Sequence, residues 1–263
     1  MKKKNIKSLV LSICCMVVCM VSAKLISEVV GPYSKNMYVN GCIGEAILVV
    51  LSIVALVLLK KTNILRFKAE GFMEGLMTGA IIPVLAICVF VTVWYEGMTV
   101  SATPFEIVAF VIHMIFVGIA EEVLFRGIVQ TSVMECIGTD SIGKVRIGIV
   151  IASVVFASVH LLNAFLPGVS YMDALRQTIS VIPVGVLFGA IYFRSKNNIW
   201  PGILLHAFND FYTFLLAGYI SSGSFGDAIS STSNSIGGTL IVFLLIDLWL
   251  LRKKKLVKCI SIE

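Results

Sequence analysis

Eight long apolar runs make up more than half of this chain, and they constrain its fold more than any other feature. They are Ser8–Val21, Ile43–Leu59, Gly71–Trp94, Phe105–Val133, Ile147–Phe165, Thr178–Phe193, Pro201–Leu216 and Ile236–Leu251. A helix needs about 20 mostly apolar residues to cross the hydrocarbon core of a bilayer. We therefore predict an all-α, polytopic membrane helical bundle of about eight transmembrane helices, formed by one integral membrane domain over residues 1–263.

The composition agrees with a membrane location, since 58% of the residues are hydrophobic and 14% are charged. Soluble domains have about 45–50% apolar and about 25% charged residues. The difference excludes an ordinary cytosolic enzyme, a disordered tail and a nucleic-acid-binding module, although the net charge is +6.

The basic residues are distributed unevenly between the two ends of the runs. If the N-terminus is cytoplasmic, 17 of the 21 Lys and Arg residues flank the runs on the cytoplasmic side, and Lys24, Lys35 and Arg176 lie outside. Cytoplasmic loops of membrane proteins carry an excess of Lys and Arg. The bias predicts two cytoplasmic termini, an even number of spans and a multi-pass protein of the cell membrane.

Two other segments are open to interpretation. The first run is short and follows three lysines, which also fits a signal peptide cleaved after Val21-Ser22-Ala23. We favour an uncleaved helix, because a chain with seven further spans can use its first one as an anchor. The segment Ser221–Ser235 is rich in Gly and Ser and predicts a loop before the last run.

The fourth run contains Glu121, Glu122 and Arg126. Charged residues inside a span are costly and by default indicate function. Adjacent residues of a helix point about 100° apart, so the two carboxylates are predicted to face different neighbours. Glu122 and Arg126 are four residues apart and can pair, which would leave Glu121 free for chemistry. The alternative is a solvated helix end, because the apolar run thins after Val133.

Two later runs contain histidines. Phe156 and His160 share one helix face in the fifth run, and His206 and Asp210 share one face in the seventh, with Asn209 nearby. A His and a carboxylate at this spacing can bind a metal or hold a water. The alternatives are a satisfied core histidine in the fifth run and a buried hydrogen-bonded pair in the seventh.

These residues are predicted to lie at similar depths. A rise of about 1.5 Å per residue places His206 roughly 9–12 Å, Glu121 roughly 15 Å and His160 roughly 21 Å from the cytoplasmic ends of their runs, with boundary errors of about 5 Å. The three helices would then direct their polar groups at one buried point, which suits activation of water beside a carbonyl. His113, Glu45 and Asp247 have no motif partners and are predicted to be structural.

The motifs Glu121-Glu122-Val123-Leu124-Phe125-Arg126, Phe156-Ala157-Ser158-Val159-His160 and His206-Ala207-Phe208-Asn209-Asp210 occur in this order. Together they resemble the CPBP family of intramembrane proteases, also called the Abi family, which includes the type II CAAX prenyl endopeptidases. The motif-bearing core is about residues 105–216. The resemblance implies a membrane-embedded endopeptidase that acts on a membrane-associated or lipidated peptide. Its role would be CAAX-type processing, maturation of a bacteriocin or signal peptide, or self-immunity to a bacteriocin.

The resemblance also implies roles for the site residues. Glu121 matches the general base and His160 its partner in activating water. His206 and Asp210 would bind the water or a metal, or stabilise the oxyanion. Many family members have Asn at the position of Asp210, and an ionised Asp cannot donate a hydrogen bond. A role as ligand or acceptor is therefore favoured for Asp210, and Asn209 can supply the missing donor.

The resemblance makes Glu122 and Arg126 supporting residues behind the catalytic groups. It leaves the cofactor open between a divalent metal such as zinc, held by His160, His206 and Asp210, and a metal-free glutamate mechanism. The expected partners are the lipid bilayer and a peptide or lipidated protein within it, cleaved nearer the cytoplasmic side.

Two other functions remain open. One is a non-proteolytic immunity protein of the same family. The other is a proton-coupled transporter that uses the buried Glu and His residues. The lack of an evident repeat between the two halves of the chain argues against a transporter.

Overall fold

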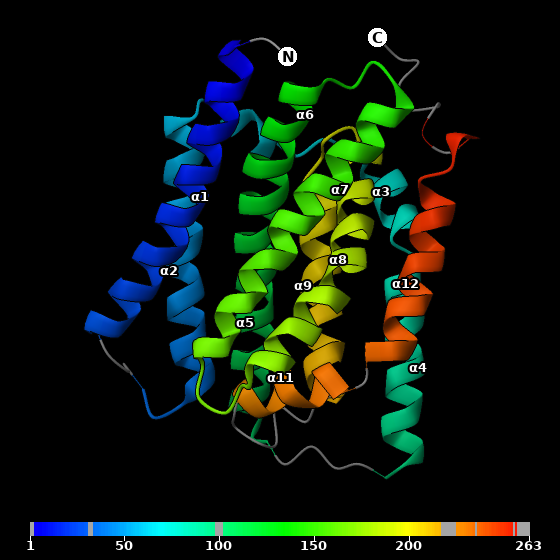
Figure 1. The fold of residues 1–263 in the computed structure, drawn as a ribbon. Helices are drawn as coiled ribbons and strands as arrows, with labels where there is room; N and C mark the ends of the chain where they lie inside the picture. The colour runs from blue at the N-terminus through cyan, green and yellow to red at the C-terminus, as the bar shows by residue number, and fades with distance from the viewer. Residues whose placement is uncertain are drawn as a thin grey trace.

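The computed structural model describes residues 3–30, 34–97, 102–216, 225–234, 236–254 and 256. Within these ranges the chain forms helices and no strands, and the long helices lie side by side as a bundle (Figure 1). The elements are α1 (Lys3–Val30), α2 (Met37–Leu58), η1 (Thr62–Leu65), α3 (Phe72–Thr78), α4 (Ile81–Tyr95), α5 (Pro104–Glu121), η2 (Glu122–Gln130), α6 (Thr131–Ile137), α7 (Ile142–Ser158), η3 (Val159–Phe165), α8 (Tyr171–Arg194), α9 (Trp200–Leu216), α11 (Phe225–Asn234) and α12 (Ile236–Leu250). The all-α prediction is confirmed for this part of the chain.

The eight apolar runs all lie in helical elements. The third is divided between α3 and α4, which are bent by 49°, and the fourth joins α5, η2 and α6. Among the described residues, five helices are long and apolar enough to cross a membrane, or six if the bent pair is one span. The last two runs form the shorter helices α9 and α12, of 17 and 15 residues. A helical membrane bundle is confirmed, while the count of eight spans stays a prediction.

The segments predicted to be cytoplasmic meet at one end of the bundle. There Lys61 Nζ lies 2.6 Å from Glu135 Oε2 of α6, and Arg146 Nε donates to the carbonyl of Leu251 at 2.7 Å. Figure 1 shows the first turns of α1 and the last turns of α12 at this same end. The arrangement fits an even number of crossings, and the side of the membrane on which this end lies is still a prediction.

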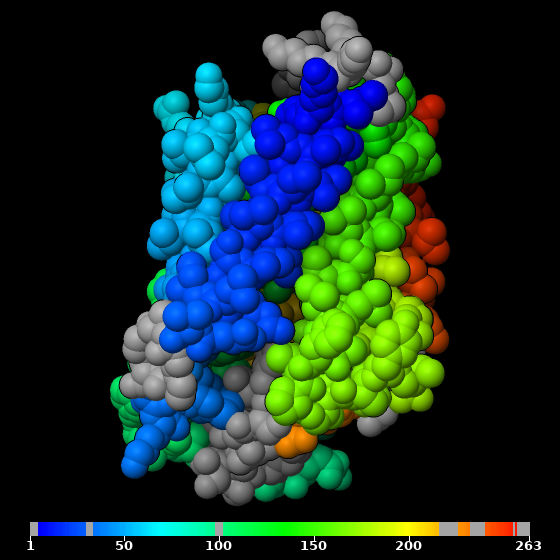
Figure 2. All heavy atoms as spheres, turned by 60° about the vertical axis from the view of Figure 1, so that its left-hand side comes forward, coloured from blue at the N-terminus to red at the C-terminus, as the bar shows by residue number. Residues whose placement is uncertain are grey.

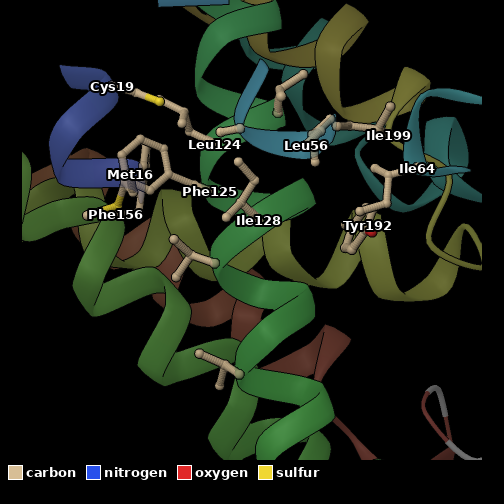
Figure 3. Close-up of a cluster of buried hydrophobic side chains, with 14 of the residues drawn as sticks. Met16, Cys19, Leu56, Ile64, Leu124, Phe125, Ile128, Phe156, Tyr192 and Ile199 are labelled. Carbon is tan, nitrogen blue, oxygen red and sulfur yellow. The ribbon is translucent and has the colours of Figure 1, made fainter. Parts of the chain in front are cut away.

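The column formed by α5, η2 and α6 runs through the centre of the bundle. Its middle section, η2, is a π-helix in which all nine residues are buried. Leu124 and Phe125 of this section belong to a core cluster with Met16 and Cys19 of α1 (Figure 3). The sequence predicted a regular helix here. The wider winding begins at Glu122, and π-helical turns are frequent at functional sites.

The first helix packs against the others as part of the bundle. Figure 2 shows α1 lying across α2 and the green segment that contains α6 and α7. Ser12 Oγ of α1 lies 2.7 Å from Ser132 Oγ of α6, and both side chains are buried. The uncleaved state of this helix stays a prediction.

The loop predicted at Ser221–Ser235 is wrong for residues 225–234, which form α11. Ala228 and Ile229 of α11 are fully buried, and a Cβ on Gly226 would lie 2.2 Å from the carbonyl oxygen of Pro167. Packing of these small and apolar residues therefore stabilises a helix in a segment whose composition favours a loop. The rest of the predicted loop lies outside the described residues.

Candidate active site

His206 of α9 lies between two carboxyl groups. Its Nδ1 is 2.8 Å from Glu122 Oε1, and its Nε2 is 3.2 Å from Glu121 Oε2. A neutral imidazole has only one N–H, so the ring donates to both carboxylates only as an imidazolium. The two carboxylates, predicted to face different neighbours, therefore share His206, and Glu122 also contacts Arg126. The histidine ring presents one nitrogen on each edge and lies between them.

The predicted pair of Glu122 and Arg126 is present. Arg126 Nε lies 3.6 Å from Glu122 Oε1, and the two side chains are 1% and 0% exposed. The alternative of a solvated helix end is therefore wrong. Arg126 Cζ also lies 4.6 Å from the centre of the Phe156 ring and 5.7 Å from that of Phe188, where cation–π attraction replaces part of the lost hydration.

The aromatic rings around His206 fix its plane. Phe188 of α8 stacks on the His206 ring, with 4.5 Å between ring centres and 21° between planes. Phe156 of α7 approaches His206 edge-on at 6.1 Å and His160 at 5.3 Å. Sequence reasoning missed Phe188, because a Phe in an apolar run cannot be told from ordinary core packing.

Asp210 and Asn209 lie one turn further along α9. Asp210 Oδ2 is 3.7 Å from His206 Nε2, and Asp210 Oδ1 accepts from Asn209 Nδ2 at 3.3 Å. Asn209 Oδ1 accepts in turn from the Tyr212 hydroxyl at 2.9 Å. The amide expected to serve as a free donor is thus directed at Asp210 and held by Tyr212, a residue that the sequence motifs do not include.

His160 lies at the edge of this cluster. It belongs to η3, the 3-10 helix that continues α7, and its Nδ1 is 3.3 Å from the carbonyl oxygen of Phe156. His160 is close enough to Glu121 and His206 to interact electrostatically with both. Within the described residues it makes no direct hydrogen bond to either side chain. The three motifs therefore converge, with His160 less tightly bound than the others.

Two glycines allow α9 to approach the acidic residues. A Cβ on Gly202 would lie 2.7 Å from Glu122 Oε2, and a Cβ on Gly118 of α5 would lie 2.9 Å from the backbone nitrogen of Ala207. Any side chain at either position would have to displace these atoms. Small residues in spans are a recognised sign of close helix packing, and this is the signal that could have identified both positions.

The site is closed on one side and accessible on the other. The Glu121 side chain is 24% exposed and that of Asp210 15%, whereas those of His206 and Glu122 are 4% and 0% exposed. Glu121 is therefore the carboxylate of the pair that a ligand can reach.

The zinc ligands implied by the resemblance do not fit this arrangement. Both nitrogens of His206 face carboxylate oxygens, at 2.8 and 3.2 Å, so a metal ion at either nitrogen would have to displace the facing carboxylate or share it. Among the described residues, no group of three or more His, Cys, Asp and Glu side chains could hold a metal ion.

The fold and the site define a helical membrane protein with a buried Glu–His centre. Residues 103–212 match the family model described as type II CAAX prenyl endopeptidase Rce1-like. The match begins at the N-cap of α5 and ends within α9, so it covers all three motifs. No curated protein and no solved structure matches the chain. The segment from 103 to 212 of this chain is therefore similar to the type II CAAX prenyl endopeptidases.

Proposed function

We propose that this protein hydrolyses a peptide bond in a membrane-associated or lipidated peptide and that Glu121 activates the attacking water. The observation that carries the proposal is the accessible Glu121 carboxylate held 3.2 Å from His206, whose other nitrogen lies on buried Glu122. A general base must be fixed, ionised and within reach of the proton that it removes. Glu121 meets these requirements better than Glu122, which is buried and bonded.

In the proposed reaction, water lies between Glu121 and His160. Glu121 accepts one water proton while the oxygen attacks the carbonyl carbon, which gives a tetrahedral intermediate. The C–N bond then breaks, and Glu121 returns the proton to the leaving amine. His160 interacts electrostatically with Glu121 and, within the described residues, makes no direct hydrogen bond to it, which supports a bridging water between the two side chains.

His206 is the proposed donor to the oxyanion. Its Nε2 faces Glu121 and Asp210, the two more exposed carboxyl groups of the site, while Nδ1 faces the buried Glu122. An oriented cationic donor in a water-poor site stabilises developing negative charge strongly. Glu122 and Arg126 hold this ring in place. His206 is proposed to be an imidazolium that donates from both nitrogens, and the proposed mechanism therefore uses no metal.

The substrate is proposed to enter from the bilayer or its cytoplasmic surface. The segments Pro104–Ile137, Ile142–Phe165 and Tyr171–Arg194 around the site are candidate membrane spans. The basic residues Lys61 and Arg146 make their contacts at one end of the bundle. A peptide with a lipid anchor or an apolar segment would be concentrated in that environment. The biological roles proposed for this proteolysis are maturation of a bacteriocin or signal peptide and self-immunity to a bacteriocin.

The test uses the full-length protein in liposomes. One probe is a fluorescence-quenched farnesylated peptide ending in a CAAX box, and a second is the same peptide without the lipid. Glu121→Gln is expected to lower cleavage by about 10²–10⁴-fold, the usual contribution of general base catalysis. Glu28→Gln is the control, because Glu28 is an exposed acid of α1 that pairs with the exposed Lys24.

Cleavage that survives Glu121→Gln unchanged would overturn the proposed mechanism. Proton flux that depends on Glu121 and His160, without cleavage of either probe, would instead favour the transporter. Full bacteriocin immunity in a strain carrying the Glu121→Gln variant would favour a non-proteolytic immunity role.

A further inference from the structure

The segment 65–79 lies between α2 and α4 and contains α3, which packs on α8 and α9 (Figure 1). It lies outside residues 103–212, which match the family model. Its neighbour is the turn between α8 and α9, where Lys196 and Asn197 have positive φ angles of 57° and 54°. For residues other than glycine this left-handed conformation costs energy, which surrounding contacts must offset. The turn that leads into α9 therefore depends on its contacts.

A set of polar contacts ties this turn to the segment 65–79. Trp200 Nε1 donates to the carbonyl oxygen of Leu65 at 3.1 Å, and Lys68 Nζ donates to that of Lys196 at 3.2 Å. Further contacts are a hydrogen bond from the buried Asn198 Nδ2 to the carbonyl oxygen of Lys68 and the ion pairs Glu70–Lys196 and Glu74–Arg194. Because several of these bonds end on backbone carbonyls, they hold the two stretches of backbone together.

Two glycines bring α3 into direct contact with α9. A Cβ on Gly75 would lie 2.7 Å from both Cβ and Cγ of Pro201, and a Cβ on Gly79 would lie 2.5 Å from Leu205 Cδ1. The Pro201 ring is closed on the backbone of α9, so it cannot rotate away from an added methyl group. A side chain at Gly75 would therefore displace the first turn of α9 itself.

The next positions of α9 face the acidic residues of the site. Gly202 follows Pro201, and His206 follows Leu205, and adjacent residues of a helix point about 100° apart. A Cβ on Gly202 would lie 2.7 Å from Glu122 Oε2, and His206 Nδ1 lies 2.8 Å from Glu122 Oε1. One face of α9 thus rests on α3 and the neighbouring face on Glu122. A displacement of α9 by α3 would move His206 relative to its carboxylates.

Gly79 also contacts the helix that supports the His206 ring. Its Cβ would lie 2.8 Å from Ile191 Cδ1 of α8. Ile191 follows Phe188, the residue that stacks on His206, by three residues and lies on the same face of α8. Ile191, Phe188 and Leu205 are buried in one core cluster, which leaves their side chains little space to rotate. Added volume at Gly79 would therefore displace α8 and α9 together.

We propose that Gly75 and Gly79 are positioning residues of the candidate active site. Without side chains, they let the segment 65–79 hold α9 where His206 reaches both Glu121 and Glu122. The segment acts through Pro201 and Leu205, and none of its residues belongs to the three motifs. The effect on cleavage rests on the proposed protease function, whereas the effect on the position of His206 does not.

The first test does not depend on cleavage. The chain has three histidines, so NMR of the full-length protein in liposomes with isotope-labelled histidine gives few ring signals, and His206→Gln identifies those of His206. Gly75→Ala is expected to shift the His206 ring resonances and to leave unchanged those of His113, which packs on α2. Gly143→Ala is the matched control, because its Cβ would have no atom nearer than 4.0 Å.

Two further variants separate positioning from damage to the fold. Pro201→Gly removes the ring that the new methyl group would meet, so Gly75→Ala combined with Pro201→Gly should return the His206 resonances toward those of the wild type. Trp200→Phe removes the hydrogen bond to Leu65 without adding an atom and should shift the same resonances. Trp94→Phe, at a residue that is 83% exposed, should not.

Trp200→Phe decides the question if Gly75→Ala prevents folding. His206 resonances that stay at their wild-type positions in the Gly75→Ala protein, or in the Trp200→Phe protein where only that one folds, would overturn the proposal. A shift in Gly75→Ala that Pro201→Gly does not reduce would also overturn it, because the contact with Pro201 would not be its cause.

The second test measures kcat and KM with the farnesylated quenched peptide. Gly75→Ala is expected to lower kcat about 10²-fold, the effect of displacing a catalytic group by about 1 Å, and to leave KM within about threefold. The combination with Pro201→Gly should recover most of the loss. An unchanged kcat in a Gly75→Ala protein with shifted His206 resonances would overturn the catalytic part of the proposal. A wild-type protein that cleaves no probe would overturn the proposed function alone, and the NMR result would still decide whether α3 positions His206.

Discussion

Glu121 Oε2 lies 3.2 Å from Nε2 of His206, and this contact joins the last residue of α5 to the middle of α9. His206 is held in turn by Glu122 at 2.8 Å, and Glu122 by Arg126 at 3.6 Å. The position of the proposed base therefore depends on a chain of charged contacts that extends into the buried π-helix. Changes at residues that a substrate cannot reach should affect cleavage through this chain.

Arg126→Met is expected to destabilise the protein and abolish cleavage. The change leaves Glu122, which is 0% exposed, with His206 as its one remaining cationic partner. Removing one member of a buried ion pair typically costs about 3–5 kcal/mol. The measurement is thermal unfolding in detergent, together with cleavage of the farnesylated probe.

Lys144→Met is the control for this prediction, because Lys144 forms an exposed pair with Asp140 at 2.8 Å, worth about 0–1 kcal/mol. The double variant Glu122→Gln with Arg126→Met should recover stability without recovering activity. An Arg126→Met protein as stable as the Lys144→Met protein would show that the buried pair does not support the fold.

Gly202→Ala is expected to lower kcat with little change in folding. The added methyl group would lie 2.7 Å from Glu122 Oε2, so the carboxylate must move and His206 with it. A displacement of about 1 Å in a catalytic group can lower the rate about 10²-fold. Gly143→Ala is the matched control, because its Cβ would have no atom nearer than 4.0 Å. Equal rates for the two variants would mean that Glu122 does not position the ring.

Much of the fold was predictable because apolar runs and basic flanks are direct consequences of a bilayer environment. The three motifs identified Glu121, His206 and Asp210, and the structure brings these side chains into contact. Sequence spacing could not predict the π-helix, because its winding depends on the packing around η2. Placing both carboxylates on one histidine ring required the positions of two separate helices.

The residues that sequence reasoning missed are of types that are common in any apolar helix. Phe188, Tyr212 and Gly202 act through their positions next to His206, Asn209 and Glu122, and nothing in their local sequence separates them from core residues.

Chelation is expected to leave cleavage intact. In the proposed mechanism His206 is an imidazolium between Glu121 and Glu122, and an imidazolium has no lone pair with which to ligate a metal. The purified protein should therefore contain far less than one zinc per chain, and treatment with 1,10-phenanthroline followed by its removal should not change kcat. One zinc per chain that is lost in both the His160→Ala and the His206→Ala variants would contradict the metal-free mechanism.

Asp210→Asn separates the two roles considered for this position. Asp210 Oδ2 lies 3.7 Å from His206 Nε2, and Asp210 Oδ1 accepts from Asn209 at 3.3 Å. If the residue acts as a polar neighbour of the proposed oxyanion donor, an amide can replace the carboxylate and also donate to the oxyanion. Cleavage by Asp210→Asn should then stay within about threefold of the wild type, whereas Asp210→Ala, which cannot hydrogen-bond, should lose about 10²–10³-fold.

The comparison is made on kcat at saturating farnesylated probe, because the predicted loss lies in the chemical step and not in binding. Thermal unfolding of both variants controls for damage to the fold. If Asp210→Asn is as inactive as Asp210→Ala, the negative charge itself is required. Asp210 would then be an obligatory partner of the His206 imidazolium, and the assignment of His206 as an oxyanion donor would need an intact carboxylate beside it.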